Sequence, residues 1–309
     1  MNTAPAAICV VGSLNMDLVV RSPQLPSPGQ TISGGPFATY HGGKGANQAV
    51  AAARLGGKVA MIGRVGDDAF GSQLRDGLAR EGIDVAQVAS VEATASGIAL
   101  ITVQEDGQNT IVIAPGANAA LSVADIEAAA DLIGQAAVLV LQLETPLETV
   151  VAAAKIAHEA GVKVVLNPAP AQPLPSELLS YVDVLMPNQS EAALLSGMAV
   201  NDEDDAVKAA QHLRSYGIDY VVVTLGDQGA LLVGPEGKQR ISAHQVKAVD
   251  ATAAGDAFVA AFAVALAEGR DYATALAWGN AAGALAVTAA GAQPSLPTRA
   301  ALEALLAGR

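Results

Sequence analysis

A run of small residues leads into an apolar helical segment near residue 250, and a carboxylate stands at the junction. The run is Asp250-Ala251-Thr252-Ala253-Ala254-Gly255-Asp256, and AFVAAFAVALAEG follows it. Backbone N–H groups at such a helix start bind anions, and the helix dipole adds to the attraction. An aspartate repels a passively held phosphate, but Asp256 is well placed to take the proton of a hydroxyl that attacks phosphorus. An ordinary first-turn carboxylate is an equal alternative, because such carboxylates are common.

Two further segments combine short polar side chains with glycines. GSLNMD occupies residues 12–17 and HGGKGANQ occupies residues 41–48. The side chains of Asn15, Asp17 and Asn47 suit a ligand with several hydroxyl groups, although an Asn-x-Asp pair alone usually marks a turn. The glycines around Lys44 indicate a hinge or a close approach of the backbone to a ligand.

Two common phosphate-binding motifs are absent. A G-x-x-x-x-G-K-[ST] loop ending at Lys44 would need other residues at Ala38 and Gly45. A G-x-G-x-x-G fingerprint starting at Gly43 fails at Gln48. These failures remove the two commonest explanations for glycine turns in an α/β protein, and they argue against a dehydrogenase.

Composition excludes several other classes. The chain has 309 residues, 51% of them hydrophobic, which suggests two domains or one large α/β domain with an insertion. Its 17 Lys+Arg against 30 Asp+Glu give a net charge of -13, which argues against a nucleic-acid or anionic-membrane surface. Cys9 is the single cysteine, so a disulfide framework and a Cys-based zinc site are excluded.

Neither apolar stretch of the sequence fits an export signal or a membrane span. Residues 6–11 are too few to span a bilayer, and no Lys or Arg precedes them. Residues 272–298 lack charge but contain Asn280 and two prolines, so they predict a buried helix instead. We therefore expect a soluble, cytoplasmic protein.

Short apolar runs alternate with alanine-rich helical stretches along most of the chain. The expected strands are 6–11, 59–62, 138–143, 162–166, 182–186 and 220–225. The expected helices are 46–55, 70–81, 146–160, 190–196 and 204–216, each followed by a glycine (Gly56, Gly82, Gly161, Gly197, Gly217). This alternation predicts an α/β fold with a mostly parallel, doubly wound sheet and helices on both faces.

Residues 17–41 and 95–113 break the alternation. The first has four prolines and short alternating segments, and the second reads as a hairpin with its turn at 105–108. Strands without helices cannot join a doubly wound layer, so we expect them to form a small separate sheet over one edge of the main domain; two unrelated surface loops are the alternative. The predicted α/β domain is then 1–16, 42–94 and 114–309.

Eight segments together resemble the ribokinase family of carbohydrate kinases. They are GSLNMD at 12–17, GGKGANQA at 42–49, QLE at 142–144, NPAPA at 167–171, PNQSE at 187–191, TLGDQG at 224–229, DATAAGD at 250–256 and GAQPS at 291–295. They occur in the family's order over almost the whole chain, and GGKGAN with A-A-G-D is a highly specific combination. The resemblance implies an α/β domain with a small β-sheet lid, and a homodimer in which two lids clasp each other.

The resemblance also implies ATP-dependent phosphorylation of D-ribose at O5, with Asp256 as the base and N–H groups of Ala254 and Gly255 on the migrating phosphoryl group. Ribose would contact Asn15, Asp17, Gly43, Lys44, Asn47, Glu144 and Asp256. Asn188 and Glu191 would serve the phosphates and Mg²⁺, and Thr224, Gly226, Gly229, Gly255 and Asn280 would bind the rest of ATP. K⁺ would be held by Asp250, Thr252, Ala286, Ala289, Gly291 and Ser295, largely through carbonyl groups.

One position departs from the family pattern. The box that starts at Asp250 usually has threonine where this chain has Ala251, so the cation site is weaker if that hydroxyl orients the loop. Kinases for 2-deoxyribose, fructose or adenosine remain alternatives, as does a sugar-binding protein without catalysis. Asp17 favours ribose over 2-deoxyribose, because one carboxylate can accept from two neighbouring hydroxyls.

Overall fold

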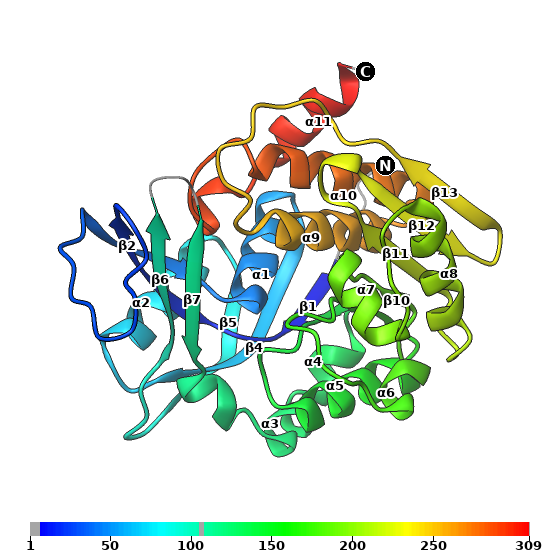
Figure 1. Cartoon of the computed structure of the whole chain (residues 1–309). Coiled ribbons are helices and arrows are strands. Elements are labelled where there is room, and N and C mark those ends of the chain that lie inside the picture. The colour runs from blue at the N-terminus through cyan, green and yellow to red at the C-terminus, as the bar shows by residue number, and fades with distance from the viewer. Residues whose placement is uncertain (1–6, 105–107, 309) are drawn as a thin grey trace.

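The computed structural model describes residues 7–104 and 108–308, which form two β-sheets of unequal size (Figure 1). Within these residues the larger sheet has nine strands in the order β13-β12-β11-β10-β9-β8-β1-β4-β5, and the smaller has four in the order β3-β2-β6-β7. The larger sheet contains β1 (Ala7–Val11), β4 (Lys58–Gly66), β5 (Asp84–Val91), β8 (Val138–Leu141), β9 (Lys163–Leu166), β10 (Val184–Leu185), β11 (Tyr220–Thr224), β12 (Ala230–Gly234) and β13 (Gly237–Ile241). The smaller contains β2 (Asn15–Ser22), β3 (Phe37–Gly42), β6 (Gly97–Gln104) and β7 (Asn109–Ala114).

The large sheet is parallel from β11 to β5, and only β12 and β13 at its other edge are antiparallel among the described strands. β1 is an interior strand of the parallel part, where Ile8 pairs with Val59 on one side and Val138 on the other. Parallel strands end at the same edge, so the residues that follow β1, β8, β10 and β11 are brought together there.

Helices cover both faces of this sheet. One face carries α1 (Lys44–Arg54), α2 (Ala69–Arg80), α9 (Ala254–Ala267), α10 (Tyr272–Ala286) and α11 (Arg299–Ala307). The other carries α3 (Val123–Ala128), α4 (Ala130–Gly134), α5 (Leu147–Glu159), α6 (Ser176–Ser180), α7 (Gln189–Ser196) and α8 (Glu203–Arg214). The doubly wound α/β fold predicted from the sequence is thus confirmed.

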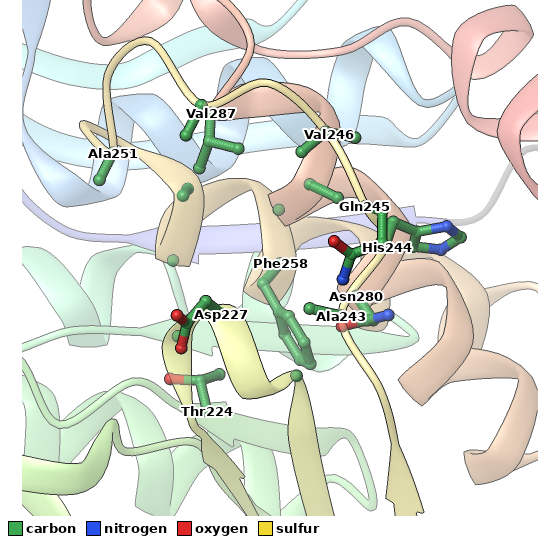
Figure 2. A pocket seen from close by; sticks show the side chains of 17 residues that line it. Thr224, Asp227, Ala243, His244, Gln245, Val246, Ala251, Phe258, Asn280 and Val287 are labelled. Carbon is green, nitrogen blue, oxygen red and sulfur yellow. The ribbon is translucent and has the colours of Figure 1, made fainter.

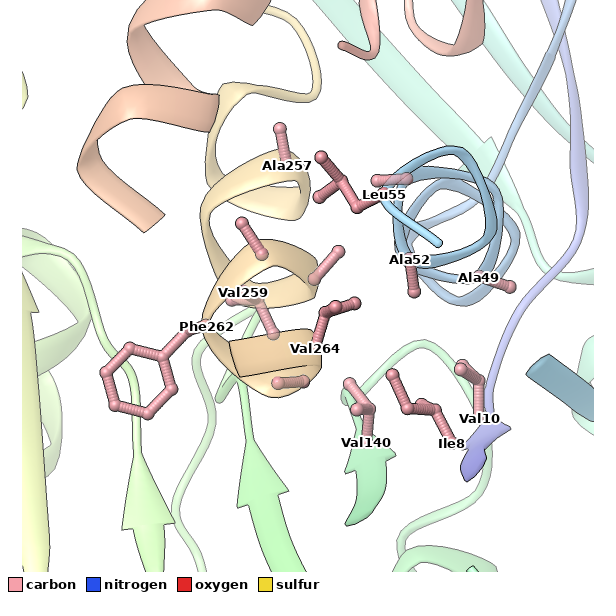
Figure 3. Close-up of a cluster of buried hydrophobic side chains, with 14 of the residues drawn as sticks. Ile8, Val10, Ala49, Ala52, Leu55, Val140, Ala257, Val259, Phe262 and Val264 are labelled. Atoms are coloured by element: carbon pink, nitrogen blue, oxygen red, sulfur yellow. The ribbon is translucent and has the colours of Figure 1, made fainter. Parts of the chain in front are cut away.

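The alternation of side chains along β1 shows how the two cores form. Ile8 and Val10 belong to the core under α1 and α9, whereas Cys9 and Val11 belong to the core on the opposite face. Figure 3 shows the first core, where side chains of α9 and α1 meet above β1 and β8. Because α9 is buried over most of its length, its N-terminus is held firmly at the edge of the sheet.

The small sheet confirms the expectation of a separate sheet rather than two unrelated loops. Its strands lie in or within two residues of the two predicted insertions, with β2 and β6 parallel and β3 and β7 antiparallel to them. Residues 105–107 of the predicted turn lie outside the described residues. The division into two domains stays a prediction.

The six expected strands and five expected helices are confirmed, with boundaries shifted by up to four residues and Ala6 outside the description. The glycines expected to end the helices all have positive φ. The sequence analysis missed β5, an edge strand that is half exposed and has no apolar run. It also missed the antiparallel hairpin of β12 and β13, which lies outside the alternation of strands and helices. Across the described parts of the chain, no helix is long and apolar enough to cross a bilayer.

Candidate active site

The N-terminus of α9 has an unusual backbone. Its cap, Ala253, has φ 59° and ψ 9°, a left-handed conformation that costs energy for a residue with a side chain. The N–H of Ala254 donates to the carbonyl of Ala251 at 3.2 Å. In the described residues the N–H groups of Gly255 and Asp256 have no backbone or side-chain acceptor, and no atom comes within 4 Å of a Cβ built on Gly255. The helix start therefore presents two unpaired donors beside open space, and a role for the Ala254 N–H stays a prediction.

The carboxylate of Asp256 is buried between α9 and α1. Its Oδ2 accepts from Nδ2 of Asn47 at 3.0 Å, and its Oδ1 accepts from Nε2 of Gln48 at 2.9 Å. Only 6% of the residue is exposed. The structure thus joins the segment 41–48 to the segment 250–256, as expected if both serve one site.

A second group of polar residues lies where β1, β2, β8 and α1 meet. Oε2 of Glu144, just beyond β8, accepts from the Ser13 hydroxyl at 2.5 Å and from the backbone N–H of Lys44 at 3.1 Å. The Asp17 carboxylate fills the space that a side chain on Gly42 would occupy. Gly43 has φ 88°, and a Cβ there would lie 2.7 Å from the Asn15 nitrogen, so glycine is required.

Charges in this group influence one another and Asp256. Burial, followed by the charges of Glu144 and Asp256, raises the pKa of Asp17 to about 7. Burial alone would lower the pKa of Lys44, but the charges of Asp256, Glu144 and Glu191 raise it above its ordinary value. Lys44 is therefore an ammonium at neutral pH, and it lies among the carboxylates predicted to bind the sugar, to act as base and to serve the phosphates.

Asn118 positions Asn15 and was missed in the sequence analysis. Its side-chain amide accepts from the N–H of Leu14 at 2.9 Å and donates to the carbonyl of Leu14 at 3.0 Å. It also donates to Oδ1 of Asn15 at 2.8 Å, so the Asn15 amide nitrogen is left for a ligand. Asn118 lies in η1 (Gly116–Ala120), whose sequence GANAA carries no motif that could have identified it.

Asn188 and Glu191 form a capping box at the start of α7. The Asn188 side chain accepts from the Glu191 N–H at 2.9 Å, and Oε2 of Glu191 accepts from the Asn188 N–H at 2.8 Å. No hydrogen bond in the described structure uses the other carboxylate oxygen of Glu191. The pKa of Glu191 lies above its ordinary value, because the effect of burial exceeds the opposing effects of the hydrogen bonds from Asn188 and of the charge of Lys44. One carboxylate oxygen is therefore free for a hard cation, whose preferred ligands are oxygens.

A pocket of about 390 Å³ opens on the other side of the α9 N-terminus (Figure 2). Asn188 and Glu191, which were predicted for the phosphates, do not line this pocket, but its wall includes the other residues predicted for the nucleotide: Thr224, Gly226, Gly229, Gly255 and Asn280. Phe258 forms an apolar surface, and 243–246 crosses one side. Nδ2 of Asn280 donates to the carbonyl of Ser242 at 3.0 Å and so fixes the segment that leads into that crossing. The pocket is lined mostly by small and apolar side chains.

Asp250 joins two of the segments predicted to bind K⁺. Its Oδ1 accepts from Thr252 N and Oγ1 at 2.9 and 2.7 Å, and its Oδ2 accepts from Gly291 N at 2.9 Å. Burial would raise the pKa of Asp250, but these hydrogen bonds and the charge of Arg21 bring it below its ordinary value. Ala286 ends α10, Ala289 follows it, and Ser295 ends η3 (Gln293–Ser295). No hydrogen bond of the described structure joins Ala286, Ala289 or Ser295 to Asp250.

The described residues contain no cluster of three or more His, Cys, Asp or Glu that could bind a metal.

Comparison with known proteins decides the family. The model of the pfkB family of carbohydrate kinases matches residues 5–299. The chain belongs to this family. It is 47% identical to the ribokinase of Haemophilus influenzae, over 94% of this chain and 95% of that protein. It is 39% identical to the deoxyribokinase of Salmonella typhimurium, over 94% and 95% of the two chains.

A solved structure of a relative supports the same placement. Arabidopsis thaliana ribokinase complexed with ribose and ATP has a TM-score of 0.90 to this chain at 36% identity, covering 98% of this chain and 99% of that one. The resemblance to the ribokinase family predicted from the eight segments is therefore confirmed, and this member has the family's large parallel sheet and separate four-stranded sheet.

Proposed function

We propose that this protein transfers the γ-phosphoryl group of ATP to O5 of D-ribose. The observation that carries the proposal is the place of the α9 N-terminus. On one side Asp256 interacts electrostatically with Asp17 and Lys44, and on the other Gly255 lines the 390 Å³ pocket. A sugar on the first side and a nucleotide on the second would place a hydroxyl next to a phosphate. The relatives named ribokinase, and the one solved with ribose and ATP, support this assignment.

The chain's own residues then have separate tasks. Asp17, Glu144 and Asn15 bind and orient the sugar hydroxyls, together with Lys44, Asn47 and the Gly43 backbone. Asp256 accepts the proton of the 5-hydroxyl as its oxygen bonds to the γ-phosphorus and the bond from phosphorus to the ADP oxygen breaks. The N–H groups at the start of α9 stabilise the charge on the transferring group.

Two cations complete the proposal. The free carboxylate oxygen of Glu191, beside Asn188, fits Mg²⁺, which when bound neutralises phosphate charge. The turn made by Asp250, Thr252 and Gly291 is tied by hydrogen bonds. The backbone carbonyls of Ala286, Ala289 and Ser295 would supply oxygen ligands of the kind that a large monovalent ion takes. Such an ion would stabilise the turn that leads to Gly255.

The monovalent cation has its own test. We expect kcat to rise when Na⁺ buffer is exchanged for K⁺ buffer at equal ionic strength. Asp250→Ala should abolish this response, because it removes the carboxylate that joins 252 to 291, while calorimetric ribose binding persists. Equal rates in the two buffers would show that Asp250 only stabilises the turn.

A substrate panel tests the proposed function as a whole. We expect kcat/KM to be highest for D-ribose, above 2-deoxyribose, fructose and adenosine, because Asp17 has two oxygens for a vicinal diol. A higher kcat/KM for 2-deoxyribose is the specific alternative, since a deoxyribokinase is among the relatives. Ribose binding without ATP turnover would instead identify a sugar-binding protein that has kept the fold.

We also propose that two small sheets pair in a homodimer. Phe37, Leu100 and Val112 are exposed large apolar residues, and the strand register places all three on one face of the small sheet. A patch of this kind marks an interaction surface more often than a free one. Light scattering should give twice the mass of one chain, and Val112→Lys should reduce it to that of a monomer.

A further inference from the structure

A chain of buried amides lies directly behind Asp256. Nε2 of Gln48 donates to Oδ1 of Asp256 at 2.9 Å and to Oδ1 of Asn167 at 3.2 Å. Nε2 of Gln142 donates to Oε1 of Gln48 at 2.6 Å, and Nδ2 of Asn167 donates to the carbonyl of Met186 at 3.1 Å. Gln142 and Asn167 directly follow β8 and β9, so the network ties the carboxylate to the edge of the central sheet.

The orientation of the Gln48 amide is determined by its neighbours, although the buried Oε1 of Gln142 has no partner in the described structure. Because Gln142 donates to the Gln48 oxygen, the Gln48 NH₂ group must face Asp256 and Asn167. Gln48 and Gln142 are 0% and 1% exposed. Burying amides is costly unless they are paired, and apolar side chains would fill a core as well. The network therefore serves something other than packing.

Gln48 differs from Asn47, its neighbour in the sequence, in what it can reach. Each donates to one oxygen of Asp256. Asn47 belongs to the set that faces the sugar side, and its Oδ1 is buried without a partner in the described structure. Gln48 has no exposed surface, and its hydrogen bonds all go to Asp256, Asn167 and Gln142. It can influence the reaction only through the carboxylate.

We propose that Gln48 is a positioning residue: its amide, oriented by Gln142 and Asn167, sets the rotation of the Asp256 carboxylate so that an oxygen lone pair faces the attacking hydroxyl. This inference rests on the proposed role of Asp256 as base. A base that is free to rotate spends less time aligned with the hydroxyl, and misplacement on the ångström scale costs up to about 100-fold in rate.

Gln48→Met tests the proposal, because methionine has nearly the same length and no N–H. We expect kcat to fall about 10- to 100-fold, with the calorimetric Kd for ribose within about threefold of wild type. The matched control is Thr149→Val, which also removes a buried side-chain hydrogen bond (to the Pro146 carbonyl, 2.7 Å) but lies on α5, away from the site. It should leave kcat unchanged. Loss of kcat in both variants alike would overturn the proposal.

Gln48→Glu is a second variant, whose pH dependence should change only if Gln48 positions Asp256. It also keeps the proposal testable if the methionine variant does not fold. Its carboxyl group donates to Asp256 while protonated, as the amide does, and repels it once ionised. Relative to wild type, kcat of this variant should therefore decline as pH rises. A constant ratio to wild type across pH would contradict the proposal.

The double variant separates this inference from the proposed function. In an Asp256→Asn background, Gln48→Met should lower kcat by less than about twofold, since its partner carboxylate is already gone. An equal loss in both backgrounds would overturn the positioning role while Asp256 remained the base. If Asp256→Asn alone kept wild-type kcat, the base assignment itself would fail.

Discussion

The proposed sugar side and the proposed nucleotide side of this site consist of different kinds of residues. On the proposed sugar side, the charge of Glu144 acts on both Asp17 and Lys44, and the Glu144 carboxylate also accepts from the backbone N–H of Lys44. On the nucleotide side, glycines, alanines and Phe258 line an open pocket. A site that pairs with ligand hydroxyls through a few buried side chains discriminates strongly, because a missing partner leaves a polar group unpaired. On the nucleotide side, the binding energy is distributed over shape complementarity and backbone contacts, so each single substitution should reduce the affinity less.

Asp256 lies between the two sides, and its loss should have the largest effect. Asp256→Asn keeps the size of the side chain but removes the base, so we expect kcat to fall about 10²–10⁴-fold. Ribose and ATP should still bind, because neither side loses its main contacts. Steady-state kinetics with calorimetry measures both, and wild-type turnover in this variant would refute the assignment.

Asp17 represents the sugar side. Hydrogen bonds to a charged group contribute about 1.5–3 kcal/mol, so Asp17→Asn should lower kcat/KM for ribose roughly 10- to 150-fold. KM for ATP should stay the same, because Asp17 does not line the nucleotide pocket. Equal changes in the two KM values would mean that the two sides are not built independently.

The raised pKa of Asp17 gives the sugar side a pH dependence. Ribose hydroxyls donate to the ionised carboxylate, so binding below the free-enzyme pKa of about 7 requires loss of a proton. Affinity should therefore weaken about tenfold from about pH 8 to about pH 6, as the ionised fraction falls. Titration calorimetry in buffers of different ionisation enthalpy measures the released proton, and Asp17→Asn should abolish the dependence.

Asn280 represents the nucleotide side and should show the smallest effect. Its amide fixes the segment next to 243–246 through Ser242, so Asn280→Ala loses one neutral hydrogen bond. A bond of about 1 kcal/mol corresponds to roughly a fivefold rise in KM for ATP, with KM for ribose unchanged. A loss as large as that of Asp17→Asn would remove the contrast between the two sides.

The same contrast explains what the sequence could predict. Strand–helix alternation and the final glycines were enough for the doubly wound sheet, because buried parallel strands are continuous apolar runs. The half-exposed edge strand β5 lacks such a run and was missed. On the sugar side, Asn15, Asp17 and Lys44 carry recognisable chemistry at recognisable spacing.

Residues that act through another residue were harder to find. Gln48, Gln142 and Asn167 lie inside the quoted segments, but nothing in a sequence shows that a residue of α1 meets the residues that directly follow β8 and β9. Asn118 lies outside every segment. Likewise, the hydrogen bond from the Ala254 N–H to the Ala251 carbonyl forms at the left-handed turn of Ala253. An alanine does not predict a left-handed backbone, so the sequence could not show this bond.

The most direct test of the account is the fate of the γ-phosphoryl group. Phosphorus NMR of the protein incubated with ATP, Mg²⁺ and D-ribose should show ribose 5-phosphate and ADP appearing in equal amounts. The Asp256→Asn variant should form almost no product over the same time. Phosphate appearing at another hydroxyl, or ADP forming with inorganic phosphate and no sugar phosphate, would contradict the account.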